Sequence, residues 1–255
     1  MIDTHIHADA RTGEDFKKMY LSGIDTAITC AYYPYRKYDD AILLNHLERI
    51  LNYDTKRAQE HGLELKVALG VHPTNTKNIN SITIYEQLEK WIENNQIIAI
   101  GEIGLENLTT SEYLIFTAQL DIAQKTKTNV IIHTPRKNKS KILNEILNIL
   151  PQHISPKYVV IDHINKNVID QVISTDYTLG LTVQPEKMDK QEAISILNEY
   201  GFDKFLLNSD SSYKASDPLS VPKTIRELKK QNFNQKDIDK IAYKNCEKFF
   251  NFKKR

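Results

Sequence analysis

The 255-residue chain is poor in cysteine and has no long apolar run. Its two cysteines, Cys30 and Cys246, are too few for a disulfide framework and lack the Cys-x-x-Cys spacing of zinc or redox motifs. Apolar stretches such as residues 158–161 fall far short of the roughly 18 residues that a membrane helix needs. The first residues, MIDTHIHADA, lack the basic start and apolar run of a signal peptide. We therefore expect a cytoplasmic protein with no membrane partner.

The chain also lacks an excess of charge of either sign. It has 34 Lys and Arg residues against 33 Asp and Glu residues, a net charge of +1. No overall field would draw it to nucleic acid, so a polyanionic partner must be held locally and nonspecific affinity for DNA should be weak. No Pro/Gly/Ser-rich linker or low-complexity block divides the sequence. We expect one domain over residues 1–255, with the basic end at 253–255 as a solvated terminus.

Short apolar runs alternate along the chain with amphipathic stretches. The amphipathic stretches carry apolar residues three and four apart, as in Leu44, Leu47 and Leu51. Continuous apolar runs such as VVI at 159–161 are typical of parallel sheets that helices cover on both faces. The eight predicted strands are Met1–His5, Asp25–Ala31, Leu65–Val71, Ile97–Ile103, Asn129–His133, Tyr158–Asp162, Thr178–Val183 and Lys204–Leu207.

This alternation predicts an α/β fold, the (β/α)8 TIM barrel, because eight βα units fit in about 250 residues. The alternative is an open doubly wound sheet, but its usual first-turn fingerprint Gly-x-Gly-x-x-Gly is missing here.

Turn and capping residues mark several helix ends. Gly62 is expected to close the long second helix, Thr110 to cap the fourth and Asp189 to cap the seventh.

Polar residues gather at the predicted C-terminal ends of the strands, where such barrels build their active sites. Five of the eight histidines lie there, whereas uniform scatter would place about one. The other three, His46, His61 and His153, are interpreted as ordinary histidines that make a hydrogen bond. The polar strand-end residues are His5, His7, His72, Glu102, His133, His163 and Asp210.

A divalent metal explains this cluster, since converging imidazoles and carboxylates would otherwise repel one another or lack partners. In His5-x-His7 both side chains leave an extended segment in the same direction and can reach one ion. Glu102, on a central strand, is the natural bridge between two ions. Water on such ions has its pKa lowered towards about 7, and Asp210 can both ligate and accept its proton. The predicted metal ligands are His5, His7, Glu102, His133, His163 and Asp210, with Glu102 and Asp210 also catalytic.

Substrate contacts are expected from residues that follow the strands. Arg136, just after the His133 strand, could meet a phosphate, or be part of a solvated helical turn. Tyr33 could stack on a base or pack at the rim. His72 could contact the substrate or orient Glu102. Further candidates on the same rim are Lys137, Lys139, Tyr32, Tyr35 and Gln184.

Short motifs that bear these residues span the whole chain. They are IDTHIH at 2–7, GVHP at 70–73, AIGEIGL at 99–105, QL at 119–120, VIIHT at 130–134, DH at 162–163 and LNSDS at 207–211. Together they resemble the TatD-related metal-dependent hydrolases of the amidohydrolase superfamily, especially their archaeal branch. The resemblance implies a (β/α)8 barrel with metals on the same six side chains. Members of that family are often metal-dependent nucleases that hydrolyse DNA phosphodiesters.

The segments around the ligands depart from the family pattern. Glu106 stands where the family usually has Asp after Gly-Leu, and HTPRK at 133–137 replaces the common His-Thr-Arg-Asp. SSYK at 211–214 replaces the usual Ala/Ser-Pro-Tyr-Leu. The resemblance therefore transfers hydrolase chemistry better than it transfers specificity for DNA.

These observations predict a divalent-metal-dependent hydrolase, a TatD-like phosphodiesterase or deoxyribonuclease that uses metal-activated water. The expected cofactors are two divalent ions of Zn, Mn, Ni, Fe, Co or Mg. The expected substrate is a DNA end or a nucleotide-like small molecule. The sequence does not predict the oligomeric state.

Other functions fit the sequence less well. A hydrolase of a lactone, amide or other small ester on the same scaffold is the main alternative. Such relatives commonly bridge their metals with a modified lysine on the fourth strand, where this chain has Glu102. A zinc deaminase would need a His-x-Glu motif with Pro-Cys-x-x-Cys. A binding protein with a structural metal would close its site with four protein ligands.

Overall fold

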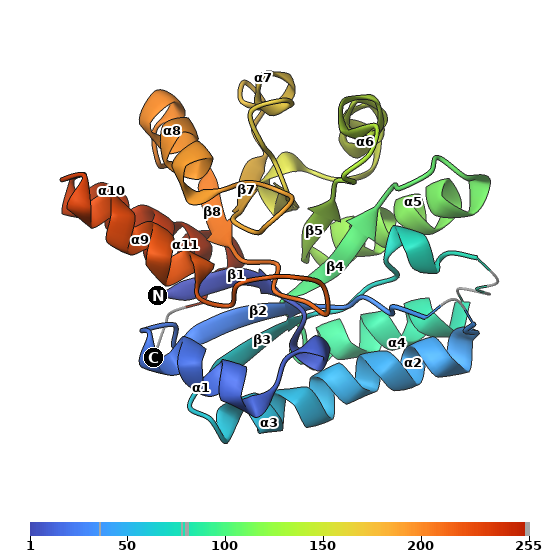
Figure 1. The fold of residues 1–255 in the computed structure, drawn as a ribbon. Helices are drawn as coiled ribbons and strands as arrows, with labels where there is room; N and C mark the ends of the chain where they lie inside the picture. Colours follow the sequence, from blue (N-terminus) through green and yellow to red (C-terminus); the bar gives the residue numbers. More distant parts are fainter. Residues whose placement is uncertain (36, 78, 80–81, 253–255) are drawn as a thin grey trace.

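The computed structural model describes residues 1–35, 37–77, 79 and 82–252, so the basic end at 253–255 lies outside the described residues. In these ranges eight parallel strands follow one another in chain order around a sheet, as Figure 1 shows. Each strand overlaps its predicted run, which confirms the expected barrel. The strands are β1 (Ile2–Ile6), β2 (Thr26–Cys30), β3 (Glu64–Ala68), β4 (Ala99–Gly104), β5 (Asn129–His133), β6 (Val159–Ile161), β7 (Thr178–Thr182) and β8 (Phe205–Asn208).

Helices surround the sheet on its outer face (Figure 1). A π-helical turn, Ile50–Asp54, runs directly from the second helix into the third. No helix within the described ranges is long and apolar enough to span a bilayer. The helices are α1 (Gly13–Leu21), α2 (Asp40–Arg49), α3 (Thr55–Gln59), α4 (Ile82–Glu93), α5 (Thr110–Thr126), α6 (Lys139–His153), α7 (Ile169–Val172), α8 (Lys190–Tyr200), α9 (Ser220–Lys230), α10 (Gln235–Asp239) and α11 (Asn245–Phe250).

The helix boundaries agree with two of the three predicted end signals. Asp189 caps α8 by accepting a hydrogen bond from Glu192 N at 2.8 Å, and Gly62 follows α3 with a φ of 86°. The prediction for α5 is wrong by one residue, because Thr109 rather than Thr110 is the cap. Thr109 keeps the extended backbone that a capping residue needs, whereas Thr110 is already helical.

The barrel closes where β1 meets the segment after β8. Asp210 N donates to His5 O, and His7 N donates to Ser211 O, both at 2.9 Å. The buried Asp3 carboxylate accepts from Ser209 N at 3.0 Å. Burial raises the pKa of Asp3 to about 7. This closure brings the His-x-His pair of the first strand next to the carboxylate that follows the last.

Apolar residues fill the opposite end of the barrel. Ile28, Ile131 and Leu206 form a cluster there with Cys246 and Phe250 of α11. Asn129, the first residue of β5, donates to Phe249 O at 3.2 Å, which places α11 at the N-terminal end of the strands. Burial of such side chains is the main source of stability in a fold of this size. The polar residues of the predicted site lie at the other end of the barrel, at the C-terminal ends of the strands.

The largest difference at a strand end is in β3, which ends at Ala68, three residues before the predicted Val71. Beyond this point Ala31 N donates to Gly101 O of β4 at 3.3 Å, so the chain after β2 bonds to β4. Directly after β3, Leu69 still bonds to β4, with Leu69 N donating to Ala99 O at 3.3 Å and Gly101 N donating to Leu69 O at 3.1 Å. Further along, the buried Gln119 of α5 holds Val71. Its Oε1 accepts from Val71 N at 2.7 Å and its Nε2 donates to Val71 O at 3.2 Å.

Candidate metal centre

The six predicted metal ligands converge at the C-terminal end of the barrel. They come from strands far apart in the sequence, and five of them are buried while His133 is slightly exposed. A close approach of strand ends is what the barrel imposes, because every strand points its carboxyl end to the same face. The six are His5 and His7 on and after β1, Glu102 in β4, His133 at the end of β5, His163 after β6 and Asp210 after β8.

Glu102 lies between two pairs of histidines. Its Oε2 is 3.4 Å from His5 Nε2 and 3.5 Å from His7 Nε2. Its Oε1 is 2.8 Å from His133 Nδ1 and 2.9 Å from His163 Nε2. The two oxygens of one carboxylate thus face two separate sets of imidazole nitrogens. This is the placement expected of the bridging residue.

Asp210 completes the set around the first histidine pair. Its Oδ1 is 3.1 Å from His7 Nε2 and 3.8 Å from His5 Nε2. One donor atom from each of these three side chains lies within 4.8 Å of the other two. The other oxygen of Asp210 contacts the ammonium group of Lys187. One oxygen of this carboxylate therefore faces the histidine pair, and the other is paired with Lys187.

The two histidines of β1 are oriented by acceptors behind them. His5 Nδ1 is 2.6 Å from Asp162 Oδ2, and His7 Nδ1 is 3.0 Å from the carbonyl oxygen of Cys30. A carboxylate and a carbonyl accept hydrogen bonds, so in each neutral ring the N–H is at Nδ1. The lone pair is then on Nε2, which faces the carboxylates of the centre. Such outer partners commonly set the orientation of metal-binding histidines.

Each of the other two histidines also has a partner on one ring nitrogen and faces Glu102 with the other. His163 Nδ1 is 2.7 Å from the hydroxyl of Thr182, which leaves Nε2 towards Glu102. His133 is turned the other way, with Nε2 2.9 Å from Glu106 Oε2 and Nδ1 towards Glu102. Ionised carboxylates only accept, so without a metal both ring nitrogens of His133 face an acceptor; a cation between Nδ1 and Glu102 would leave the ring proton on Nε2, facing Glu106. The structure thus shows which nitrogen of each ring faces Glu102 and would be the one to bind a metal.

The donor atoms of this centre suit a divalent cation. His5 Nε2 is buried and has no hydrogen-bond partner within the described part of the chain. A buried nitrogen that faces a carboxylate at 3.4 Å is costly unless a cation lies between them. Imidazole nitrogens with carboxylate oxygens are a ligand set for Zn, Mn, Fe, Co or Ni. The residues present therefore fit a metal.

The two carboxylates and His163 have protonation states that favour cation binding, whereas without a metal neighbouring groups, Glu102 among them, raise the pKa of His5 and of His133 against the effect of burial. Burial opposes ionisation of Glu102, but the imidazoles of His5 and His133 outweigh it and hold the pKa of Glu102 well below its ordinary value. Burial likewise opposes ionisation of Asp210, and the ammonium of Lys187 outweighs it, so that pKa is also well below ordinary. Burial and the charge of Lys187 lower the pKa of His163 to about 4. At neutral pH the carboxylates are charged and this ring is neutral.

Asp162 is held rigidly behind His5. Its Oδ1 accepts from Asn208 Nδ2 and from His163 N, both at 2.8 Å. A Cβ atom on Gly180 would lie 1.9 Å from this oxygen, so only glycine leaves room for the carboxylate.

The loop that carries Glu106 is held in a similar way by a single acceptor. The buried Glu112 accepts at Oε2 from the backbone N–H groups of residues 106, 107 and 108 at 2.8, 2.8 and 3.1 Å.

Two of the three predicted substrate contacts lie at the mouth. His72 Nε2 is 3.8 Å from Glu102 Oε2, while its Nδ1 is 2.7 Å from Thr74 Oγ1. Arg136 borders the same mouth and donates from Nη2 to Gln184 Oε1 at 2.9 Å. Both side chains are placed where a substrate could reach them. Their roles remain predictions.

Tyr33, the third predicted contact, points elsewhere. Its ring packs against His46 with centroids 5.2 Å apart, and its N–H donates to Asn75 at 3.1 Å. The mouth is lined instead by Tyr32, whose ring is 4.8 Å from that of His72. Neighbouring residues of an extended segment point to opposite sides, so one tyrosine faces the cavity and the next faces α2. The Tyr32 and Tyr213 hydroxyls are 3.1 Å apart.

The histidines outside the centre behave as interpreted from the sequence. Each makes a hydrogen bond within its own neighbourhood and none belongs to the cluster of ligands. The pairs are His46 Nε2 with Tyr32 O at 3.2 Å, His61 Nδ1 with Arg57 O at 2.9 Å and His153 Nδ1 with Asp121 Oδ1 at 2.7 Å.

The mouth above the centre is a cavity of about 490 Å³ with several cations at its rim. Lys187, in the turn after β7, is the residue that sequence reasoning missed. It lies four residues beyond the end of a predicted strand at Val183, but no motif marks it. Burial and the nearby Lys187 also lower the pKa of Lys139 to about 7. The cationic residues that line the mouth are Arg136, Lys137, Lys187 and Lys214.

Comparisons with known proteins identify the family of this chain. The family model described as TatD related DNase matches residues 2–251. An uncharacterised metal-dependent hydrolase of Methanocaldococcus jannaschii is 40% identical over 252 residues, which is 98% of this chain and 99% of that protein. The crystal structure of a TatD-like protein of Archaeoglobus fulgidus matches with a TM-score of 0.82 and 28% identity, over 98% of this chain and 100% of that one.

A more distant structure shares the fold alone. The phosphotriesterase homology protein of Escherichia coli matches with a TM-score of 0.72 at 16% identity, over 98% of both chains. The full-length match to the family model and the 40% identity to the archaeal hydrolase decide the assignment. The chain belongs to the TatD family and is a metal-dependent hydrolase.

Proposed function

We propose that this protein is a phosphodiesterase that binds two divalent metal ions and acts on DNA ends or nucleotide-like small molecules. The observation that carries the proposal is the position of Glu102, whose two oxygens face two different histidine pairs. One ion would be held by His5, His7 and Asp210, and the other by His133 and His163, with Glu102 shared. When bound, two such ions would supply an activated water and offset charge on a phosphoryl oxygen.

The residues of the chain have distinct tasks in this reaction. Asp210 places Oδ1 towards the first histidine pair and is positioned to accept the proton of the attacking water. Its second oxygen stays on Lys187, which holds the carboxylate in one orientation. Arg136 at the rim supplies positive charge for a phosphate group. The stacked rings of Tyr32 and Tyr213, with centroids 5.8 Å apart, offer an aromatic surface to a base.

The charge balance of the chain supports a small or terminal substrate. With a net charge of +1 the protein has no overall excess of positive charge to attract a long duplex. The cations at the mouth lie instead around a cavity of about 490 Å³. A cavity of this size accommodates a small molecule or the end of a strand.

The proposal is tested by stripping the purified protein of metal, restoring single metals and assaying two substrates. These are single-stranded DNA and a small chromogenic phosphodiester. Wild type is compared with Glu102→Ala and Asp210→Asn, and with Glu93→Ala, an exposed glutamate at the end of α4, as the matched control. We expect metal-dependent cleavage of both substrates, lost by at least about 100-fold in the two site variants and kept in the control.

A different result separates the chemistry from the substrate. One such result is that the wild type binds metal while both site variants fail to bind it and neither phosphodiester is cut. In that case the assignment of the metal centre is correct and the phosphodiesterase proposal is wrong. Esters, lactones and amides then form the next substrate panel. If cleavage survives in Glu102→Ala, the role of Glu102 as the shared ligand is refuted.

A further inference from the structure

The turn between β7 and α8 is closed by its own hydrogen bonds. Gln184 N donates to Met188 O at 3.1 Å, and Met188 N donates to Gln184 O at 3.2 Å. Glu186 at the tip has a left-handed backbone with a φ of 70°, which few non-glycine residues adopt. Lys187 N donates back to Gln184 O at 3.1 Å. The turn therefore presents the Lys187 side chain from a fixed backbone position.

The same turn is linked to the metal centre through its side chains. Gln184 Nε2 donates to Asp210 Oδ2 at 3.3 Å, and Gln184 Oε1 accepts from Arg136 Nη2 at 2.9 Å. Lys187 Nζ also contacts Asp210 Oδ2. The oxygen that faces His7 is the other one, Oδ1. Lys187 can consequently keep its contact with Asp210 while that residue binds a metal.

Both cations have donors left for a further partner. An ammonium group has three N–H donors, and within the described part of the chain the Lys187 side chain uses one, on Asp210. Arg136 has five donors and gives one to Gln184. Its ion pair with Glu186 spans 3.7 Å and ends on a carboxylate that is 74% exposed, so that pair is weak.

The free donors border the space where a substrate would enter. Lys187 and Arg136 line the mouth cavity together with His163, one of the six ligands. They also line a small recess of about 50 Å³ beside it, which they share with Lys139. Lys187 and Arg136 place two positive charges at this recess beside the amine of Lys139, and an anion bound there would offset their repulsion. The recess opens next to the metal centre.

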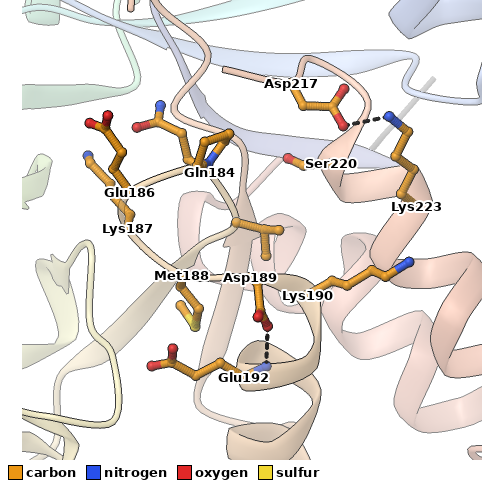
Figure 2. Close-up of a pocket in the computed structure, with 12 residues that line it drawn as sticks. Gln184, Glu186, Lys187, Met188, Asp189, Lys190, Glu192, Asp217, Ser220 and Lys223 are labelled. Atoms are coloured by element: carbon orange, nitrogen blue, oxygen red, sulfur yellow. Dashed lines mark hydrogen bonds and ion pairs between the residues drawn. The ribbon is translucent and has the colours of Figure 1, made fainter. Parts of the chain in front are cut away.

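The other side of the turn faces a different cavity, of about 440 Å³. Figure 2 shows Glu186 and Lys187 projecting to one side of the turn, with Lys190 and Lys223 on the other. Lys223 pairs with Asp217 at 2.6 Å, across this second cavity. Lys223 thus has the same kind of partner as Lys187 but lies away from the metal centre. It provides a matched control.

We propose that Lys187 and Arg136 form a subsite for an oxyanion group of the substrate, next to the bond that is hydrolysed. The ligand group is a phosphate or a carboxylate, since both accept charge-assisted hydrogen bonds from ammonium and guanidinium groups. The inference rests on the proposed function only in placing the hydrolysed bond at the metal centre. It predicts a preference for substrates that carry an anionic group beside the reacting bond, such as a phosphorylated strand end, over neutral esters.

The test measures binding without turnover. Inorganic phosphate and acetate are titrated by calorimetry into the metal-loaded protein, and metal content is measured for every variant. We expect Lys187→Met to weaken phosphate binding about tenfold or more, and Arg136→Met to act in the same direction. Lys187→Arg should restore most of the affinity. Lys223→Met should bind as wild type does, and metal content should stay at the wild-type level throughout.

Two outcomes would overturn the subsite. One is wild-type phosphate and acetate affinity in Lys187→Met. The other is a parallel loss of metal in Lys187→Met and Lys187→Arg, which would mean that Lys187 acts only on Asp210. The comparison of phosphate with acetate identifies which oxyanion the subsite prefers. Because no turnover is needed, a protein that binds phosphate through Lys187 but cuts no phosphodiester would refute the proposed function and keep the subsite.

Discussion

The carboxylate of Asp162 lies 2.6 Å from Nδ1 of His5, on the side of the ring away from the other ligands. The opposite nitrogen, Nε2, faces Glu102 and Asp210. Asp162 is therefore placed to keep the proton on Nδ1 and the metal-binding lone pair on Nε2. The DH motif at 162–163 thus supplies one residue that orients the predicted ligand His5 and one residue, His163, that is itself a predicted ligand.

Replacing Asp162 by Asn should weaken metal binding. The amide can present its N–H₂ group as well as its oxygen to His5, so the ring is no longer confined to one tautomer. We expect metal affinity to fall by about 10- to 100-fold, measured by titration of the stripped protein with a chromophoric ion such as Co²⁺. The matched control is Asp121→Asn, whose carboxylate lies 2.7 Å from Nδ1 of the peripheral His153. Equal metal affinity in Asp162→Asn and in the control would refute this role.

Replacing Glu106 by Gln should affect one part of the centre only. Glu106 holds Nε2 of His133 at 2.9 Å and so directs Nδ1 towards Glu102. If two ions bind as proposed, the variant should hold the ion at His133 and His163 about tenfold more weakly or worse and keep the other. Metal stoichiometry at limiting concentration should then fall from two towards one.

The control for this variant is Glu89→Gln, which changes a surface glutamate paired with Lys125. A stoichiometry that is unchanged in Glu106→Gln would contradict the assignment. Glu106→Asp is informative as well, because aspartate is the residue that the family pattern usually has here. Its shorter side chain should keep the acceptor and recover part of the affinity.

Gly180→Ala should destabilise both the fold and the centre. The added Cβ would lie 1.9 Å from Asp162 Oδ1, so the carboxylate or the strand must move. Overpacking of this kind typically costs about 1–3 kcal/mol of unfolding free energy. Urea denaturation measures that cost, and metal titration should show weaker binding because His5 loses its oriented partner. An alanine variant with wild-type stability and affinity would show that the strand yields freely at this point.

Asp54 gives a prediction for the pH dependence of stability. It pairs with Arg57 at 2.7 Å and Arg49 at 3.5 Å, yet burial outweighs both cations and raises its pKa above the ordinary 3.8. The folded state then binds a proton more tightly than the unfolded chain does. The stability that wild type gains over Asp54→Asn is greatest below pH 3.8 and declines as pH rises through the folded-state pKa.

Urea unfolding of wild type and Asp54→Asn at several pH values from about 4 to 7 tests this sign. The free-energy difference, wild type minus variant, should fall across the series. A difference that rises with pH would mean that the two arginines lower the pKa of Asp54 below that of the unfolded chain.

The sequence by itself determined the barrel and the candidate ligands. Apolar runs such as 129–133 and 159–161 specify strands through their own side chains, and the segments between them specify helices by their period. Because parallel strands in a barrel end at one face, the polar residue that closes each run could be assigned to a common site. His5, His7, Glu102, His133, His163 and Asp210 were found in this way, and the structure brings all six together.

Only the tertiary structure decided which way individual side chains point and which loops, distant in the sequence, contact one another. Which nitrogen of His133 faces Glu102 follows from Glu106, and Tyr32 rather than Tyr33 lines the mouth. Lys187 meets Asp210 only because the turn after β7 lies against the segment after β8. Local patterns fix which elements form, whereas side-chain direction and contacts between loops are set by the closure and packing of the whole barrel.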